Sequence, residues 1–391
     1  MRNNNVLLVV VAGIALSVDI GFARLGYGLT LPAMKESLRG SFSLFGIIAT
    51  LHLGGYLFGS LFAPVVLRKL DWKRSFLISH ILILIGLVFQ ASVSTVEMLA
   101  VARVFLGIGT GLGVLFALGA AMEIVDPTRR LKVSGIVWTG VALGMMVTAP
   151  AASWTLVDFE RWRTVWWVSS VPTALVVILG LFCTFPTHQS LSKNSSSIKM
   201  FDALKELKSS YFLLLSYFFY GFAYFVYATF TLSDALDRLS NTTVQPAHLW
   251  LAFALAASVG SMLLPVFVGG GLKKHAMTIS VGVAAIGACI ALLPIDIAAI
   301  LGALLIGFGL TSTPAIASAL TRGRVSNAAG PNALAIATVA VAAGQMVGPA
   351  LSGYSIDLFG ISAMIVLVLA GYVLATVFAI VDSGFNRQSN N

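Results

Sequence analysis

The sequence predicts an all-helical membrane protein with twelve transmembrane helices, arranged as two pseudo-symmetric bundles of six. Three observations predict this fold. The composition is 58% hydrophobic and only 10% charged, apolar runs of about 20 residues recur along the chain, and segments of the first half reappear in the second. Soluble domains carry about 25% charged residues. So little charge cannot make a soluble surface, and we expect the apolar side chains to face lipid.

Twelve apolar runs are long enough to cross the hydrocarbon core of a bilayer. They cover residues 6–31, 43–67, 76–94, 98–122, 132–154, 164–185, 211–233, 248–268, 276–294, 297–320, 333–353 and 361–381. Runs of this length without alternating polar positions indicate helices rather than barrel strands. The first run resembles a signal peptide, but it continues through Asp19 and Arg24 to Pro32 without a small-residue cleavage site. We therefore expect a transmembrane helix there.

The basic residues predict the orientation in the membrane. With the N-terminus inside, 17 of the 24 Lys and Arg residues fall in inner segments and five in outer segments. The other two, Arg24 and Arg103, lie well inside the runs. Such an excess is typical of cytoplasmic loops, so both termini are expected in the cytoplasm. The same loops account for the net charge of +9 without a nucleic-acid partner.

The two halves repeat at an offset of 200 residues. The matches are Gly21-Phe22-Ala23 with Gly221-Phe222-Ala223, Tyr27 with Tyr227, Gly107 and Gly109 with Gly307 and Gly309, and Gly144 with Gly344. The polar stretch at 187–210 separates the halves. We expect bundles at 1–187 and 211–391, and a cytoplasmic linker at 188–210 with an amphipathic helix at 201–207. Internal repeats are typical of secondary transporters, which bind solute near the midplane.

Motifs in both halves resemble those of the major facilitator superfamily over essentially the whole chain. They are Leu99-x-x-x-Arg103-x-x-Leu106-Gly107-x-Gly109 and Gly344-x-x-x-Gly348-Pro349-x-x-Ser352-Gly353. The fifth run has Gly140-x-x-x-Gly144, with Met145 where the family's exporter motif has proline, which argues against an antiporter. Residues 68–74 keep the basic residues of a family loop motif but not its acid and glycine positions.

The segment Phe22-Ala23-Arg24-Leu25-Gly26-Tyr27-Gly28-Leu29-Thr30-Leu31-Pro32-Ala33-Met34 resembles the YbfB/YjiJ-like branch of that family. This resemblance implies a monomeric carrier in the bacterial inner membrane. It says nothing about the substrate.

Asp19, Arg24, Arg103 and His52 are ionisable residues inside the predicted spans. Arg103 lies about 7–8 Å from the outer end of its helix, Arg24 about 10 Å, His52 about 13 Å and Asp19 about 18 Å. Charged groups are costly in hydrocarbon, so these residues are candidates for function. Asp19 and Arg24 are five residues apart, or about 140° around an α-helix. We therefore expect Asp19 to meet a residue of another helix, Arg103 or His52.

We hypothesise that Arg24 and Arg103 bind an anionic group of the substrate, because a guanidinium matches carboxylates bidentately. Asp19 or His52 would take up and release a proton. Three alternatives stand beside this reading. Arg103 forms a structural ion pair with Asp19, Arg24 extends to the outer headgroups, or His52 is an ordinary core residue.

Aromatic and amide side chains are further candidates to line the substrate site. Tyr27 follows Arg24 by one turn, and the repeat places Tyr224 opposite Arg24. Tyr220 shares the stripe of Tyr224. Trp138 and Gln345 carry polar groups at a depth within their spans from which they could contact a substrate. No pattern indicates a metal or cofactor site, since Cys183 and Cys289 both lie in apolar stretches.

These features favour a secondary transporter of a small solute over the other classes of membrane protein. The sequence lacks the zinc-protease, nucleophile-elbow and phosphate-loop patterns of enzymes. It also lacks a repeated channel filter and an added signalling domain. The buried arginines favour proton-coupled symport of an organic anion by alternating access. The aromatic residues and the Gly-Pro motif favour the alternative, proton-antiport efflux of drugs or metabolites.

Overall fold

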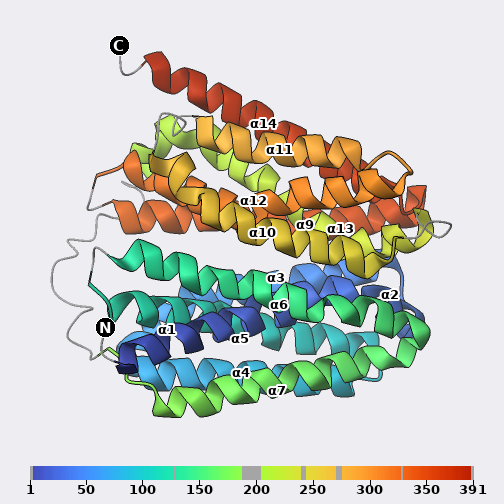
Figure 1. Cartoon of the computed structure of the whole chain (residues 1–391), viewed down its shortest axis with the longest axis horizontal. Coiled ribbons are helices and arrows are strands. Elements are labelled where there is room, and N and C mark those ends of the chain that lie inside the picture. Colours follow the sequence, from blue (N-terminus) through green and yellow to red (C-terminus); the bar gives the residue numbers. More distant parts are fainter. Residues whose placement is uncertain are drawn as a thin grey trace. The chain divides into compact units, whose positions relative to one another are not determined.

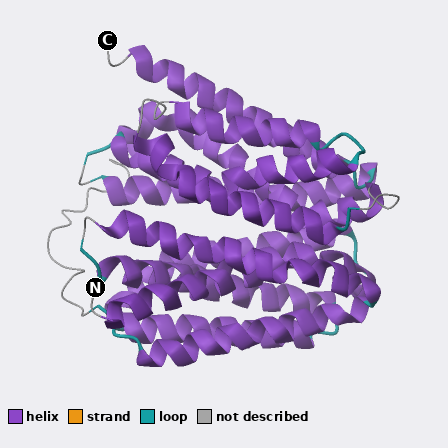
Figure 2. Ribbon diagram, viewed as in Figure 1, coloured by secondary structure: helices purple, strands orange, loops and turns teal. Residues whose placement is uncertain are grey.

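A computed structural model describes residues 3–126, 129–186, 204–238, 244–269, 275–326 and 329–388. Helices and short connections make up all of these residues, and no strand occurs among them (Figure 2). The chain divides into two units. Unit 1 comprises Met1–Leu191 with Gln245–Leu251, and unit 2 comprises Ser192–Val244 with Ala252–Asn391.

Unit 1 contains six long helical segments (Figure 1). They are α1–η1–α2 (Asn3–Leu16, Ser17–Leu25 and Gly26–Leu38), α3 (Phe42–Lys69), α4 (Trp72–Ser92), α5 (Val96–Glu123), α6 (Arg130–Val157) and α7 (Trp162–Phe182). The segment η1 packs against α6 and also contacts α4, α5 and α7. α5 packs along α3 and α4. The first span therefore lies against most of the helices of its unit.

The main helices of unit 2 come from the second half of the chain. They are η5 (Leu207–Ser210), α9 (Tyr211–Arg238), α10 (Pro246–Gly269, which begins in the part assigned to unit 1), α11 (Ala276–Ile290), α12 (Asp296–Gly323), α13 (Gly330–Phe359) and α14 (Ala363–Gln388). α9 packs against α13 and α14, and α11 packs against α12.

Side-chain caps explain where several helices begin. The hydroxyl of Ser41 accepts a hydrogen bond from the Leu44 amide at the start of α3. Asp71 accepts one at the start of α4, as Thr95 does at the start of α5. Each side chain satisfies an amide that has no partner within its own helix. The polar residues between the apolar runs thus fix the helix boundaries.

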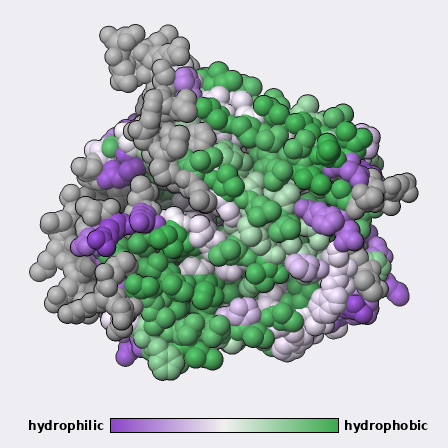
Figure 3. Space-filling model, in the orientation of Figure 1, coloured by the Kyte–Doolittle hydropathy of each residue, from purple (hydrophilic) through white to green (hydrophobic). Residues whose placement is uncertain are grey.

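The predicted set of membrane spans is confirmed. Ten helices of the described residues are long and apolar enough to cross a membrane. Two shorter apolar stretches, Pro246–Gly260 of α10 and Ala276–Ile290 (α11), bring the number to twelve. Large apolar side chains such as Leu61, Ile85 and Val366 are exposed along the helices. Figure 3 shows these apolar surfaces in green, with hydrophilic residues gathered toward the helix ends. This distribution suits contact with lipid tails.

The first helix is longer than predicted. We expected it to end near residue 31, but it continues through Pro32 to Leu38. The apolar run ends where the hydrocarbon ends, whereas the backbone hydrogen bonds of a helix can continue into water. The predicted amphipathic helix at 201–207 lies partly outside the described residues, as does most of the predicted linker at 188–210.

The internal repeat extends to the packing of the helices. A side chain at Gly107 of α5 would collide with the carbonyl of His52 on α3, and one at Gly307 of α12 with the carbonyl of Phe253 on α10. Likewise, Gly144 of α6 abuts the carbonyl of Ser17, and Gly344 of α13 abuts the carbonyl of Phe218 on α9. Small residues at matching positions therefore let corresponding helices approach closely in both units.

Candidate functional site

The middle of the first span is a π-helix. The segment η1, Ser17–Leu25, carries both Asp19 and Arg24, and all of its residues from Val18 onward are buried. The α-helical angle of about 140° between Asp19 and Arg24 was therefore wrong, because a π turn joins residues five apart and brings their side chains closer to one face. π segments are frequent at functional sites.

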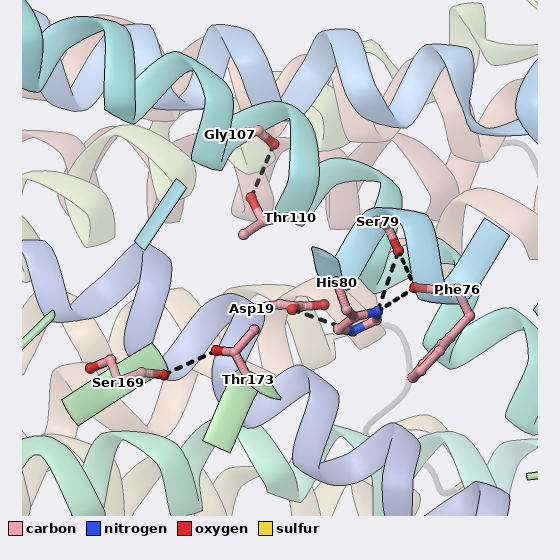
Figure 4. Close-up of polar contacts among 8 residues, drawn as sticks. All are labelled: Asp19, Phe76, Ser79, His80, Gly107, Thr110, Ser169 and Thr173. Atoms are coloured by element: carbon pink, nitrogen blue, oxygen red, sulfur yellow. Dashed lines mark hydrogen bonds and ion pairs between the residues drawn. The ribbon is translucent and has the colours of Figure 1, made fainter. Parts of the chain in front are cut away.

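Asp19 meets a histidine that the sequence reasoning did not consider. Its Oδ1 lies 3.6 Å from Nε2 of His80 on α4, and both side chains are fully buried. Nδ1 of His80 bonds the carbonyl of Phe76 at 2.7 Å and lies 3.3 Å from the hydroxyl of Ser79 (Figure 4). Asp19 forms no ion pair with Arg103 or His52, the partners that we expected. His80 is therefore the residue that faces Asp19, and the two form an ion pair when the imidazole is protonated.

Arg103 braces the first span against α5. Its Nη1 donates a hydrogen bond of 2.7 Å to the carbonyl of Ala23. Its guanidinium lies over the ring of Tyr27, 4.4 Å from the centroid. The Tyr27 hydroxyl in turn donates to the Phe45 carbonyl on α3 at 2.9 Å. Tyr27 therefore holds the guanidinium between the first span and α3.

His52 and Arg24 lie in the same region of unit 1. Nδ1 of His52 is 3.2 Å from the carbonyl of Arg103, so the two residues are joined through the backbone. Arg24 extends from η1 over the ring of Tyr56 on α3, 5.0 Å from its centroid. The structure thus brings three basic side chains together with two tyrosine rings.

The tyrosines of α9 form a stack in unit 2. The ring of Tyr220 lies 5.8 Å from that of Tyr217 and 5.4 Å from that of Tyr224, both nearly parallel. The Tyr220 hydroxyl donates to the carbonyls of Gly309 and Leu310 on α12. Tyr372 of α14 contacts the edge of this stack at 6.5 Å. The stack joins three helices of the unit.

The two remaining candidates lie on α6 and α13. Trp138 is half-buried on α6, and Gln345 is buried on α13. The structure therefore groups the candidates in two places. Unit 1 holds Asp19 with His80, together with Arg24 and Tyr27 of the first span, Arg103 of α5 and His52 of α3, whereas unit 2 holds Tyr220 with Tyr224.

The sequence held a signal for His80 that our reasoning passed over. A histidine within an apolar run is a titratable group in hydrocarbon, and such groups are candidates for function by default. What the sequence does not give is the packing of the first span against α4, which brings residues 61 positions apart into contact.

A family comparison agrees with the fold and with the motifs around these residues. The model of a family described as "Uncharacterised MFS-type transporter YbfB" matches residues 16–382. The chain belongs to the major facilitator superfamily. It is thus a multi-pass membrane transporter of this superfamily and not an enzyme.

Curated relatives match this transporter over shorter stretches. The uncharacterized transporter YgaY of Escherichia coli O157:H7 is 30% identical over 41% of this chain and 40% of its own length. The multidrug resistance protein MdtL of Shewanella oneidensis is 24% identical over 44% of this chain and 43% of its own. A protein named "Probable plastidic glucose transporter 3" of Arabidopsis thaliana is 23% identical over 43% of this chain and 31% of its own length. The matched stretches span less than half of each relative.

Solved structures of the same superfamily share the whole fold. The nucleoside transporter NupG superimposes with a TM-score of 0.77 at 15% identity, over 98% of this chain and 99% of its own. A bacterial homologue of the human lysosomal transporter Spinster gives 0.72 at 16% identity, over 98% and 96%. At these identities the likeness establishes the fold alone.

Proposed function

We propose that this transporter carries a small organic anion across the bacterial inner membrane by alternating access, in symport with protons. The observation that carries the proposal is the guanidinium of Arg103. It is fully buried, and its Nε and Nη2 have no hydrogen-bond partner. Buried donors of a charged group are costly to leave unpaired. A substrate carboxylate, reaching Arg103 in another conformation of the cycle, would supply the missing acceptors.

The charge balance around Arg103 supports an anion. Arg24 is 6% exposed and carries a second guanidinium on the neighbouring span, while Asp19 is already paired with His80. Among the residues that the structure describes, no carboxylate forms an ion pair with Arg103. Two positive charges near one paired acid give this region an excess positive charge. A bound anion would offset it, and guanidinium groups bind carboxylates in a fixed bidentate geometry.

The tyrosine rings would add apolar contact for the body of the substrate. Tyr27 and Tyr56 already lie under the two guanidinium groups. Each offers a flat apolar surface beside a positive charge. This combination suits a carboxylate with a small organic group better than an inorganic anion, which has no apolar part to bury.

Proton coupling would use the buried acid of the same span. Asp19 lies in the π-helical segment five residues before Arg24. Binding of an anion at the arginines and of a proton at Asp19 would each change the charge of one short segment. Each ligand would then favour the facing conformation that it binds more tightly.

Transport by purified protein in liposomes tests the proposal. Labelled mono- and dicarboxylates are offered with the inside of the liposomes alkaline, and uptake is compared between wild type and Arg24→Gln. We expect wild-type uptake of at least one carboxylate and a loss of about tenfold or more in the variant, the cost of one charge-assisted contact. Undiminished uptake would remove Arg24 from the substrate site.

The matched control is Arg161→Gln. Arg161 lies near the start of α7, is 38% exposed and pairs with Asp158 at 3.8 Å. The variant removes one positive charge from unit 1 without touching the buried arginines. Its uptake should equal that of wild type. An equal loss in both variants would mean that net charge, and not the site, governs uptake.

A second candidate is proton-antiport efflux of a drug or metabolite. The stack of Tyr217, Tyr220 and Tyr224 favours it, because aromatic rings offer an apolar surface to bulky cations and neutral compounds. Protection of the purified protein against heat separates the candidates. Carboxylates should raise its unfolding temperature if the anion proposal holds, and aromatic cations should raise it if the efflux alternative holds.

A further inference from the structure

We propose that Asp19 and His80 form a single proton-binding site that holds one proton between them. The inference deepens the proposed function and rests on it in one respect, since the proton bound here would be the one that is cotransported. The pair lies wholly within unit 1. The carboxylate comes from η1 and the imidazole from α4, with the facing atoms 3.6 Å apart.

The hydrogen bonds of His80 fix which nitrogen faces Asp19 as an acceptor. Nδ1 lies 2.7 Å from the carbonyl of Phe76. A carbonyl only accepts, so Nδ1 carries the hydrogen. The hydroxyl of Ser79 already donates to the same carbonyl. In a neutral imidazole the other nitrogen, Nε2, is then an acceptor, and this is the atom that faces the carboxylate (Figure 4).

Two facing acceptors make a site for one proton. Both carboxylate oxygens of Asp19 and Nε2 of His80 have no hydrogen-bond partner. A single added proton turns one of the two groups into a donor toward the other. The pair is then neutral overall, either as carboxylic acid with imidazole or as carboxylate with imidazolium. Without that proton the pair carries an unpaired negative charge, and with a second proton an unpaired positive one.

Burial makes the singly protonated state the favoured one in this conformation. Both side chains are 0% exposed, and an uncompensated charge is costly at such a place. The proton is therefore retained while the site is sealed. It leaves when another conformation exposes the pair to water. This ties proton release to conformational change, as a coupled carrier requires.

Several other ionisable groups lie on the helices around the pair. The helices packed against η1 and α4 carry, within the spans, Arg24, Tyr27, His52, Tyr56 and Arg103. None of these forms an ion pair with Asp19 or His80. The remaining charged groups of these helices are toward their ends: Lys35, Glu36, Arg68, Lys69, Lys73, Arg74, Glu97, Glu123, Arg130, Lys132 and Arg163. Among the described residues, Asp19 and His80 therefore have no ionic partner other than each other.

Gly113 leaves room for the carboxylate. A Cβ at this position of α5 would lie 2.7 Å from Oδ2 of Asp19. Any larger residue would displace the carboxylate from the space beside His80. A glycine at this one place is therefore a condition for the pair.

The second unit shows that the fold does not need a charged pair here. At the offset of 200, Ser280 of α11 corresponds to His80 and Thr313 of α12 to Gly113. In unit 2 these two hydroxyls bond each other at 2.7 Å and join α11 to α12 without an ionisable group. In unit 2, the contact between these two helices is therefore made by two neutral side chains. The acid and the base are therefore a feature of unit 1 that the packing of the helices does not require.

The experiment measures proton binding without any solute. Full-length protein in lipid nanodiscs is titrated, and infrared difference spectra record its carboxyl and imidazole bands. Among the bands of the chain's 15 acidic residues and five histidines, we expect one carboxyl band and one imidazole band that change with a common midpoint. Asp19→Asn should abolish that carboxyl band and leave the other carboxyl bands in place. His80→Gln should abolish the imidazole band and shift the carboxyl midpoint by about one pH unit or more, because the two groups titrate as a coupled pair.

Asp234→Asn is the matched control. Asp234 is a buried acid of α9, but Arg238 holds it bidentately at 2.6 and 2.5 Å. This carboxylate lies in unit 2 and has a guanidinium partner of its own, so the variant should leave both bands of the Asp19–His80 pair unchanged. Bands that persist in Asp19→Asn, or that titrate independently of each other, would overturn the proposal. If either Asp19→Asn or His80→Gln fails to fold, the other variant still shows whether the two groups titrate together.

Failure of this site and failure of the proposed function are distinguishable. A common titration of Asp19 and His80, together with no uptake of any carboxylate, would leave the proton site standing and refute the anion substrate. Carboxylate uptake by a protein that lacks the common titration would refute the site and leave the anion proposal intact.

Discussion

The guanidinium of Arg103 donates a hydrogen bond of 2.7 Å to the carbonyl of Ala23, which ties α5 to the π-helical segment of the first span. An irregular helix leaves carbonyls available to side-chain donors. Arg103 takes one of these carbonyls and lies over Tyr27 at the same time. The irregular segment that carries Asp19 and Arg24 is therefore held in place by a residue of a neighbouring helix.

We predict that Arg103→Gln lowers the free energy of unfolding by about 2–3 kcal/mol, the value of a buried hydrogen bond from a charged group. Arg103→Lys should recover little of it, since an ammonium group cannot reproduce the planar contact with Tyr27. Thermal unfolding in detergent measures both. Two variants as stable as wild type would show that Arg103 does not brace the first span.

The tyrosine stack of unit 2 allows a matched pair of substitutions. Tyr220→Phe removes a hydroxyl that donates to Gly309 and Leu310, so we expect a loss of about 1 kcal/mol. Tyr372→Phe removes a buried hydroxyl that has no partner, so its stability should be unchanged or raised. Thermal unfolding of both variants checks this difference. The opposite order of stability would contradict the hydrogen bonding described for α9.

The repeat predicts equal effects at equivalent glycines. Gly107→Ala and Gly307→Ala should each destabilise the protein by about 1–3 kcal/mol, because the added methyl group meets a backbone carbonyl that cannot move aside. Gly135→Ala on α6 is the control, since nothing lies within 4 Å of its added Cβ. Unfolding temperatures measure all three. A harmless Gly307→Ala beside a harmful Gly107→Ala would contradict equivalent packing in the two units.

The basic loops predict the topology. With both termini in the cytoplasm, a green fluorescent protein fused to the C-terminus should fluoresce in bacterial cells, and an alkaline phosphatase fused there should be inactive. A fusion of each reporter in the outer loop near Arg161 should give the reverse. Active phosphatase at the C-terminus would refute the orientation.

Much of the fold could be predicted from the sequence, because every segment that crosses lipid needs a helix of about 20 mostly apolar residues. The predicted span at 43–67 became α3, Phe42–Lys69, and Ser41 caps its start. Long apolar runs set the helices, and the polar residues between them set the boundaries. The extension of the first helix to Leu38 could not be predicted, since hydropathy reports the lipid boundary and not the helix end.

The site was predicted less completely. The residue types in apolar runs singled out Asp19, Arg24 and Arg103, all of which are buried. The π-helix could not be predicted, because its hydrophobic pattern does not differ from that of an α-helix over nine residues. The partner of Asp19 depends on which helices pack together, and periodicity along one helix holds no information on this. For that reason His80 emerged only from the structure.

The most direct test of the account is the uptake of labelled carboxylates by liposomes, under an inward proton gradient, with wild type, Arg24→Gln and Asp19→Asn compared. The account predicts gradient-driven uptake by wild type, loss of uptake in Arg24→Gln, and uptake in Asp19→Asn that no longer responds to the gradient. Wild-type protein that takes up no carboxylate, or an Arg24→Gln variant that transports as well as wild type, would contradict it.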